Sequence, residues 1–171
     1  MTRNEAARSR QAVTVECRVN GRRVRAQVPT HRVLLDFLRD DLGLTAAKRA
    51  CDVQVCGACT VLVDGLPVSA CTYLAVEIDG RSVESCEGLL QDGRLHPIQQ
   101  AFVDAGALQC GFCTPGMIMI TKALLEDYPQ PSAKEITAYL HGNLCRCTGY
   151  KKIIEAIQTA AKSQAPVGNQ R

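Results

Sequence analysis

Eight of the ten cysteines in this 171-residue chain fall into two quartets, and their spacing constrains the fold more than any other feature. The first quartet, C-x4-C-x2-C-x11-C, consists of Cys51, Cys56, Cys59 and Cys71. The second, C-x2-C-x31-C-x-C, consists of Cys110, Cys113, Cys145 and Cys147. Four thiolates hold one iron–sulfur cluster, and the first spacing is typical of plant-type [2Fe–2S] sites. The quartets therefore predict two [2Fe–2S] clusters in one small chain, which indicates an electron relay.

Disulfides and zinc are the alternative uses of so many cysteines. Residues 1–13 contain no apolar stretch of the kind found in a secretory signal, and tight C-x2-C and C-x-C pairs favour metal over bridges across a fold. Zinc binds C-x2-C pairs well, but C-x4-C-x2-C with a distant fourth cysteine is the iron–sulfur pattern. We therefore expect bound iron and a reducing, cytoplasmic location.

Charge and hydropathy exclude two classes of partner. The net charge of +3 is too small to indicate nucleic-acid binding, and no apolar run approaches the length of a membrane span. Basic residues gather locally at Arg18, Arg22, Arg23 and Arg25. A solvated face is the first interpretation of this group, and a docking surface for an acidic partner is the second.

The first part of the chain has the pattern of a small α+β domain. Residues 1–12 are expected to form a disordered tail. Alternating apolar residues over 13–19 predict a strand, and Asn20-Gly21 predicts a tight turn into a second strand over 24–28. Helical spacing follows over 33–42, ending at Gly43, and further strands are expected over 60–63, 66–70 and 82–86. The domain should cover residues 13–89.

The second part of the chain, residues 90–162, has a helical pattern and is followed by an expected disordered tail over 163–171. Helices are expected over 97–105, over 117–125 with Thr114 as N-cap and Pro115 at the first position, after Ser132, and over 153–161. Ser132 with Glu135 forms a capping box. The second quartet precedes two of these helices, whose N-termini would offer free amides and partial positive charge to an anionic cluster.

Several residues have a simple structural interpretation. Gly57 lets the first cysteine loop pass close to a cluster. Cys17 and Cys86 have no ligand-spaced partner and are expected to be small buried hydrophobic residues. Capping or surface roles are expected for the three histidines, His31, His96 and His141. Met117 and Met119 lie on the most apolar helix and are expected in the core.

Five motifs make the chain resemble the small iron–sulfur subunit of the molybdenum hydroxylases, the xanthine oxidase and aldehyde oxidoreductase family. They are CGACTV at 56–61, EGL at 87–89, HPIQ at 96–99, QCGFCTPG at 109–116 and GNLCRCTGY at 142–150. The resemblance extends over about residues 13–160.

The resemblance implies a β-grasp plant-type [2Fe–2S] ferredoxin domain followed by a four-helix-bundle [2Fe–2S] domain. It implies an electron-transfer subunit of an oxidoreductase, with no catalytic site of its own. Electrons would pass from molybdopterin, expected as the cytosine dinucleotide, on a large subunit to FAD on a medium subunit, in a heterotrimer that could dimerise. The cluster of Cys110 would lie near the molybdopterin, and Gln109 matches the family residue that contacts the pterin.

Two departures from the family pattern fall in the first cysteine loop. Ala50 and Gln54 stand where the family usually has glycine. If either backbone position needs a positive φ, a residue with a side chain costs about 1 kcal/mol there. A stand-alone two-cluster ferredoxin and a zinc-stabilised interaction module remain alternative functions.

Overall fold

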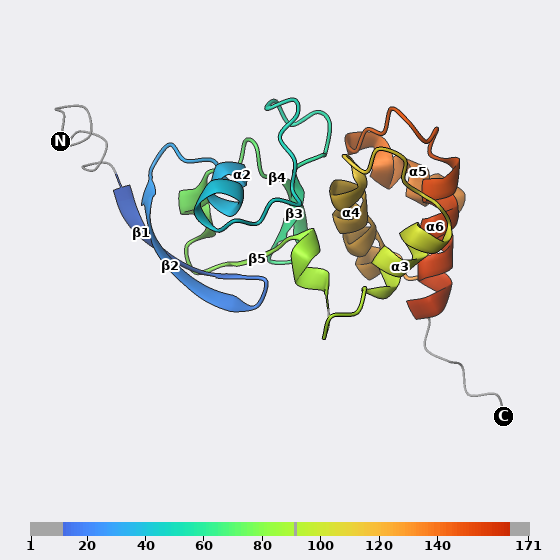
Figure 1. Cartoon of the computed structure of the whole chain (residues 1–171), viewed down its shortest axis with the longest axis horizontal. Coiled ribbons are helices and arrows are strands. Elements are labelled where there is room, and N and C mark those ends of the chain that lie inside the picture. The colour runs from blue at the N-terminus through green and yellow to red at the C-terminus, as the bar shows by residue number, and fades with distance from the viewer. Residues whose placement is uncertain (1–11, 91, 165–171) are drawn as a thin grey trace.

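The computed structural model describes residues 12–90 and 92–164, which form a strand-rich half and a helical half lying side by side (Figure 1). The α+β class expected from the sequence is confirmed. Of the tails expected over 1–12 and 163–171, residues 1–11 and 165–171 lie outside the described residues. Ala12 already belongs to the first strand, and the last helix continues to Gln164.

A mixed five-stranded sheet forms the first half. Its strands are β1 (Ala12–Val19), β2 (Arg22–Pro29), β3 (Thr60–Val63), β4 (Leu66–Ser69) and β5 (Ser82–Glu84). They are ordered β2-β1-β5-β3-β4, and β1 and β5 are parallel while the other neighbours are antiparallel. The expected turn joins β1 to β2, with positive φ at both Asn20 and Gly21.

The helix of this half differs from the single helix expected over 33–42. A short α-helix, α2 (Leu34–Asp36), continues as a π-helical turn over Phe37–Asp41. The turn is wide because the Leu42 amide bonds to the carbonyl of Phe37, five residues back, at 3.1 Å. Gly43, at a φ of +71°, then ends the helix as expected.

The second half contains four α-helices within residues 92–164. They are α3 (Pro97–Asp104), α4 (Thr114–Asp127), α5 (Ala133–Tyr139) and α6 (Lys151–Gln164). The Ser132–Glu135 capping box is confirmed, because each residue's side chain accepts a bond from the other's amide. His96 caps α3, with Nδ1 accepting from the Ile98 amide at 3.2 Å.

The expected N-cap of α4 was wrong by one residue. Thr114 is already the first helical residue, and Cys113 is the N-cap but makes no capping bond with its side chain. The helix begins early because Cys113 has helical angles and the Thr114 amide bonds back to the Gly111 carbonyl. Met117 and Met119 lie fully buried within α4, as expected.

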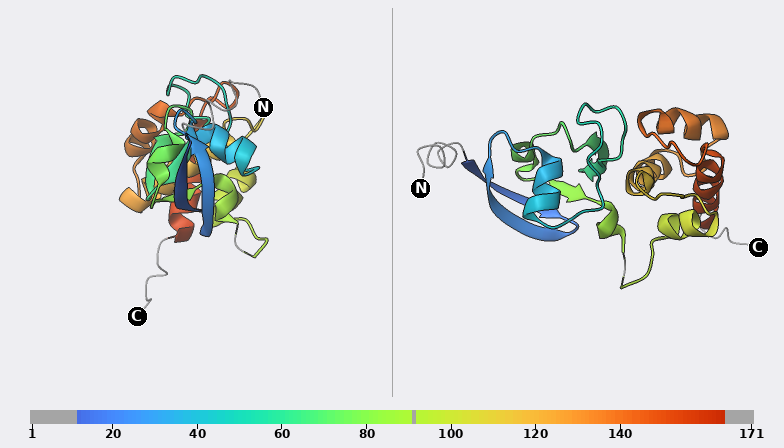
Figure 2. Two further views of the ribbon diagram at one scale, coloured as in Figure 1. Left: turned by 90° about the vertical axis from the view of Figure 1, so that its left-hand side faces the viewer. Right: turned by 45° about the horizontal axis from the view of Figure 1, so that its top comes forward.

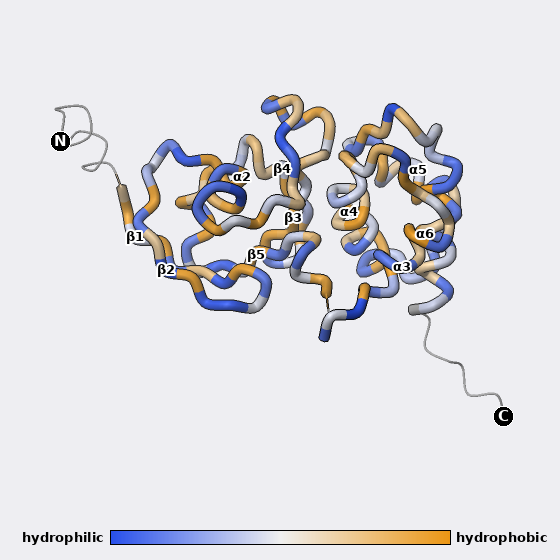
Figure 3. The backbone as a smooth tube through the Cα atoms, viewed as in Figure 1, coloured by the Kyte–Doolittle hydropathy of each residue, from blue (hydrophilic) through white to orange (hydrophobic). Residues whose placement is uncertain are grey.

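Strand β3 joins the two halves because both of its faces are buried. Val61 and Val63 belong to the core of the sheet half, whereas Leu62 belongs to the core of the helical half. Helix α4 packs against β3 and β4, and Figure 3 shows hydrophobic segments in both halves. An ion pair between Lys122 and Glu84, at 3.2 Å, also links α4 to the sheet. Residues 92–96, which precede α3, loop away from both halves (Figure 2).

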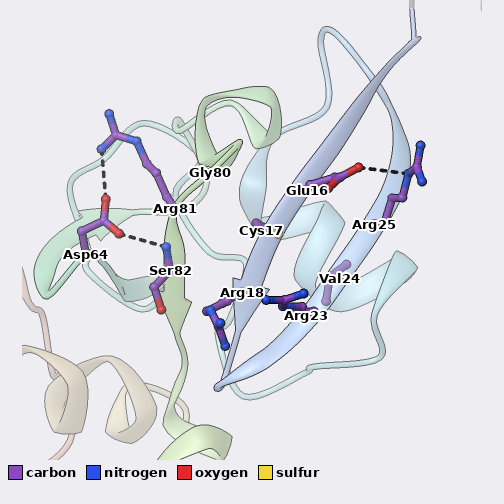
Figure 4. Close-up of a pocket in the computed structure, with 10 residues that line it drawn as sticks. All are labelled: Glu16, Cys17, Arg18, Arg23, Val24, Arg25, Asp64, Gly80, Arg81 and Ser82. Carbon is purple, nitrogen blue, oxygen red and sulfur yellow. Dashed lines mark hydrogen bonds and ion pairs between the residues drawn. The ribbon is translucent and has the colours of Figure 1, made fainter.

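The outer face of the sheet carries a groove of about 600 Å³ lined by arginines (Figure 4). Arg25 pairs with Glu16 at 3.2 Å, and Arg81 pairs with Asp64 at 3.6 Å. Arg18 and Arg23, in contrast, stand directly opposite each other on β1 and β2. Two like charges in this cross-strand position are unfavourable.

Reversing one charge of this pair should stabilise the protein. Arg23→Glu replaces repulsion with attraction to Arg18, and we expect the free energy of unfolding to rise by about 0.5 kcal/mol at low salt. Urea unfolding measures the change. Arg22→Glu alters the net charge equally but lies opposite Val19, so it should give a smaller gain. Equal effects from the two variants would contradict the cross-strand explanation.

None of the helices in residues 12–90 and 92–164 is long and apolar enough to cross a membrane.

Candidate metal centres

The first quartet lies at the edge of the sheet half that faces the helices. Cys51, Cys56 and Cys59 are on the loop before β3, which rises at the top of Figure 1, and Cys71 follows β4. Cys59 and Cys71 are buried close together, where β3 and β4 adjoin and the Ala70 amide donates to the Cys59 carbonyl at 3.4 Å. Cys51 and Cys56 form a second pair, half-exposed at the rim of the loop.

Backbone amides of this loop point at the sulfur of Cys51. The amides of Val53, Val55 and Cys56 lower the pKa of its thiol to about 6, and the Val55 amide lies 3.4 Å from the sulfur. Burial has the opposite effect on Cys59, whose pKa it raises to about 12. The loop is therefore arranged to stabilise a negative sulfur at its rim and to hold another in the interior.

The second quartet lies at the start of α4 and on the loop before α6. The sulfurs of Cys110 and Cys147 are 3.6 Å apart and exposed. Cys113 and Cys145 form the inner pair, and burial, followed by the contact with Cys145, raises the pKa of Cys113 to about 12. The pKa of Cys145 is lowered overall. Burial alone would raise this pKa, but bonds from the Thr148 hydroxyl, at 3.0 Å, and from nearby amides outweigh the effect of burial.

The arrangement of thiols in pairs fits a two-iron cluster. None of the ten cysteines is in a disulfide. Across residues 12–90 and 92–164, no three His, Cys, Asp or Glu side chains converge as the ligands of a single metal ion would. In each quartet the thiols instead meet two by two, which matches two irons that each take two thiolates.

The two departures in the first loop have different consequences. Gln54 has a φ of +58°, whereas Ala50 has no positive φ. Of these two positions, only Gln54 therefore has the backbone conformation that favours glycine. Its side-chain oxygen accepts a bond from the Thr72 hydroxyl at 3.2 Å. This bond ties the loop to the residue after Cys71.

Two substitutions at residue 54 separate backbone strain from the lost bond. Both Gln54→Gly and Gln54→Ala remove the bond to Thr72, but only alanine keeps a Cβ at positive φ. We expect the glycine variant to be more stable than the alanine variant by about 1 kcal/mol. Urea unfolding of the anaerobically purified chain gives the difference. An alanine variant as stable as the glycine variant would show that the loop relaxes to a negative φ.

Gln109 lies on the surface beside the exposed Cys110, and Phe112 and Leu144 nearby are 45% and 51% exposed. The structure thus leaves the surroundings of the outer cysteine pair open to a partner. The contact of Gln109 with a pterin stays a prediction. Cys17 is buried, as expected, whereas Cys86 is only half-buried, and burial raises the pKa of each thiol.

Two residues that shape these sites were not predicted from the sequence. Asn143 is buried and bonds to the first cysteine loop, and the Tyr150 hydroxyl accepts a bond from the Cys145 amide at 2.9 Å. Their only signal in the sequence is their place in the run 142–150, beside two of the cysteines. Which polar group meets which loop follows from tertiary packing alone.

The chain is similar to known iron–sulfur proteins. Two family models match, described as "2Fe-2S iron-sulfur cluster binding domain" at residues 17–107 and "[2Fe-2S] binding domain" at 85–158. The nicotinate dehydrogenase small FeS subunit of Eubacterium barkeri is 45% identical over 150 residues, which are 88% of this chain and 96% of that protein. The xanthine dehydrogenase iron-sulfur-binding subunit of Escherichia coli O157:H7 is 42% identical over 90% of this chain and 98% of its own length.

Solved structures show the same relationship. The crystal structure of quinoline 2-oxidoreductase from Pseudomonas putida 86 contains a chain that is 42% identical, with a TM-score of 0.86 over 90% of this chain and 96% of that one. Aldehyde oxidoreductase from Desulfovibrio gigas matches with a TM-score of 0.84, and this chain covers 17% of it. The chain therefore belongs to the family of small iron–sulfur subunits of the molybdenum hydroxylases, the xanthine oxidase and aldehyde oxidoreductase family.

Proposed function

We propose that this chain is an electron-transfer subunit that carries two [2Fe–2S] clusters. It passes electrons from molybdopterin on a large subunit to FAD on a medium subunit of a molybdenum hydroxylase, and it has no catalytic site of its own. The observation that carries the proposal is the division of eight thiols into two quartets, each made of two pairs, in one small chain.

The residues that would hold the clusters follow from the pairs. Cys51 and Cys56 would bind one iron of the first cluster, and Cys59 and Cys71 the other. In the second cluster the pairs are Cys110 with Cys147 and Cys113 with Cys145. A bound [2Fe–2S] cluster supplies a centre that takes up and releases one electron. The amides at Cys51 and the Thr148 hydroxyl at Cys145 favour the charged form of the sulfurs.

The surface around each quartet supports contact with partner subunits. Val53 and Val55, on the first cysteine loop, are 65% and 57% exposed. Phe112 and Leu144 flank the second quartet and are also exposed. Apolar side chains gathered at a functional site are typical of a protein interface. With Gln109 beside Cys110, the second surface is the one we assign to the molybdopterin subunit.

Iron content and spectroscopy test the proposal directly. The chain, purified without oxygen, should contain about four irons, and reduction should give two distinct [2Fe–2S] EPR signals. A colourless protein that contains zinc instead would overturn the assignment. Purification of the native complex should also yield a molybdopterin-binding and a FAD-binding subunit. A chain that holds both clusters but purifies with no large partner would instead be a stand-alone ferredoxin.

A further inference from the structure

The two cysteine-bearing segments touch each other directly at the boundary between the halves. The amide of Leu144, the residue before Cys145, donates to the carbonyl of Cys56 at 2.9 Å. Beside it, the side chain of Asn143 donates from Nδ2 to the Gly57 carbonyl at 3.1 Å and to the Thr60 hydroxyl at 3.2 Å. Residues more than 80 positions apart are thereby joined next to a ligand of each quartet.

Asn143 is also tied to the loop of the second quartet. Its backbone carbonyl accepts a bond from the Tyr150 hydroxyl at 3.3 Å. The same hydroxyl accepts from the amide of Cys145 at 2.9 Å. Asn143 therefore bonds through its side chain to the first cysteine loop and through its backbone to the second.

The contact leaves little room for movement. Asn143 is only 4% exposed. A Cβ added to Gly57 would lie 2.4 Å from the Gly142 carbonyl and 2.5 Å from the Asn143 side chain. The Gly57 carbonyl also accepts from the Thr60 hydroxyl at 2.7 Å, so the three polar groups form a closed, buried set. Removal of one member leaves the others buried without a full set of partners.

We propose that Asn143 is a positioning residue that holds the two cluster-binding segments in register and thereby sets the rate of electron transfer between the clusters. The inference rests on the proposed function, because it concerns transfer between two clusters of this chain. Asn143 acts through the backbones of the neighbouring Cys56 and Cys145 and is not a ligand itself.

The rate should depend on this contact for a physical reason. Electron tunnelling weakens steeply with distance and with each gap between bonded atoms. The bond from the Leu144 amide to the Cys56 carbonyl closes the gap between the two ligand segments. The Asn143 side chain, one residue away, holds the same two segments together, so its loss should lengthen or loosen that bond.

Two substitutions of the buried set test the proposal in the full chain with both clusters bound. Asn143→Ala removes the donor, and Thr60→Val removes one of its acceptors while keeping the size and branching suited to β3. Each variant should retain about four irons and two EPR signals. The magnetic coupling between the two reduced clusters should become weaker or heterogeneous. After flash photoreduction, electron transfer between the clusters should be several-fold slower than in the unmodified chain.

Matched variants separate positioning from a general loss of stability. Thr60→Ser keeps the hydroxyl and should restore the coupling and the rate. Thr121→Val removes another buried hydroxyl bond, from Thr121 to the Met117 carbonyl at 2.7 Å within α4. That variant should lose stability but keep both the coupling and the rate, because Thr121 lies outside the contact between the two cysteine-bearing segments.

The outcomes distinguish this inference from the function on which it rests. If the unmodified chain lacks two clusters, the proposed function is wrong. If it holds both, and Asn143→Ala leaves the coupling and the rate unchanged, only the role of Asn143 is wrong. Should Asn143→Ala fail to fold, Thr60→Val decides the question in the same way. A Thr121→Val variant that slows transfer as much would also overturn the role of Asn143.

Discussion

Replacing Gly116 by alanine should destabilise the protein by about 3 kcal/mol, at the upper end of the usual range for overpacking. Gly116 lies in the first turn of α4, where the helix meets the first cysteine loop. An added Cβ would lie 2.2 Å from the Gly57 carbonyl oxygen and 3.4 Å from Cα of Ala58. Both atoms belong to backbone, so no side-chain rotation can relieve the collision.

Glycine at 142 provides the matched control for this effect. Gly142→Ala makes the same chemical change near the same boundary, but its Cβ would meet nothing within 4 Å and its φ is not positive. We expect its free energy of unfolding to stay within about 0.5 kcal/mol of the unmodified chain. Urea unfolding and iron analysis of both variants test the pair. A stable Gly116→Ala chain with a full iron content would show that α4 can move away from the loop.

Local patterns in the sequence were sufficient to predict most of the secondary structure. The alternation over 13–19, the Asn20-Gly21 turn and the Ser132–Glu135 capping box depend on near neighbours in the chain, and the structure contains all three. The second cysteine quartet is different, because the contacting sulfurs of Cys110 and Cys147 are 37 positions apart in the chain. Motifs with a local physical cause are therefore readable from one sequence.

Some features that the sequence did not reveal depend on local backbone bonds, and others depend on contacts between distant segments. The π-helical turn over Phe37–Asp41 and the early start of α4 at Thr114 both depart from the expected local pattern. Burial of both faces of β3 requires the helical half to pack there, which no alternation within four residues can show. Nothing in the sequence distinguishes Asn143 from an ordinary loop residue, because its partners Gly57 and Thr60 are more than 80 positions away.

Substituting one ligand of each quartet should remove one cluster at a time. In Cys113→Ser, iron should fall from about four to about two per chain, and the EPR signal of the first cluster should persist. Cys56→Ser should give the reciprocal result. Cys86→Ser is the matched control, because Cys86 is a half-buried thiol near Gln99 and lies outside both quartets. This variant should keep about four irons.

Stability should fall with the cluster that is lost, because metal binding contributes directly to the free energy of folding. Cys113 is the N-cap of α4, and its partner Cys145 lies on the loop before α6, so the second cluster would fasten two helices to each other. Amide hydrogen exchange in Cys113→Ser should therefore increase most in α4 and α6, and in Cys56→Ser it should increase most around β3 and the loop before it. A full complement of iron in either variant would mean that the altered cysteine is not a ligand, and the division of eight thiols into two clusters would fail with it.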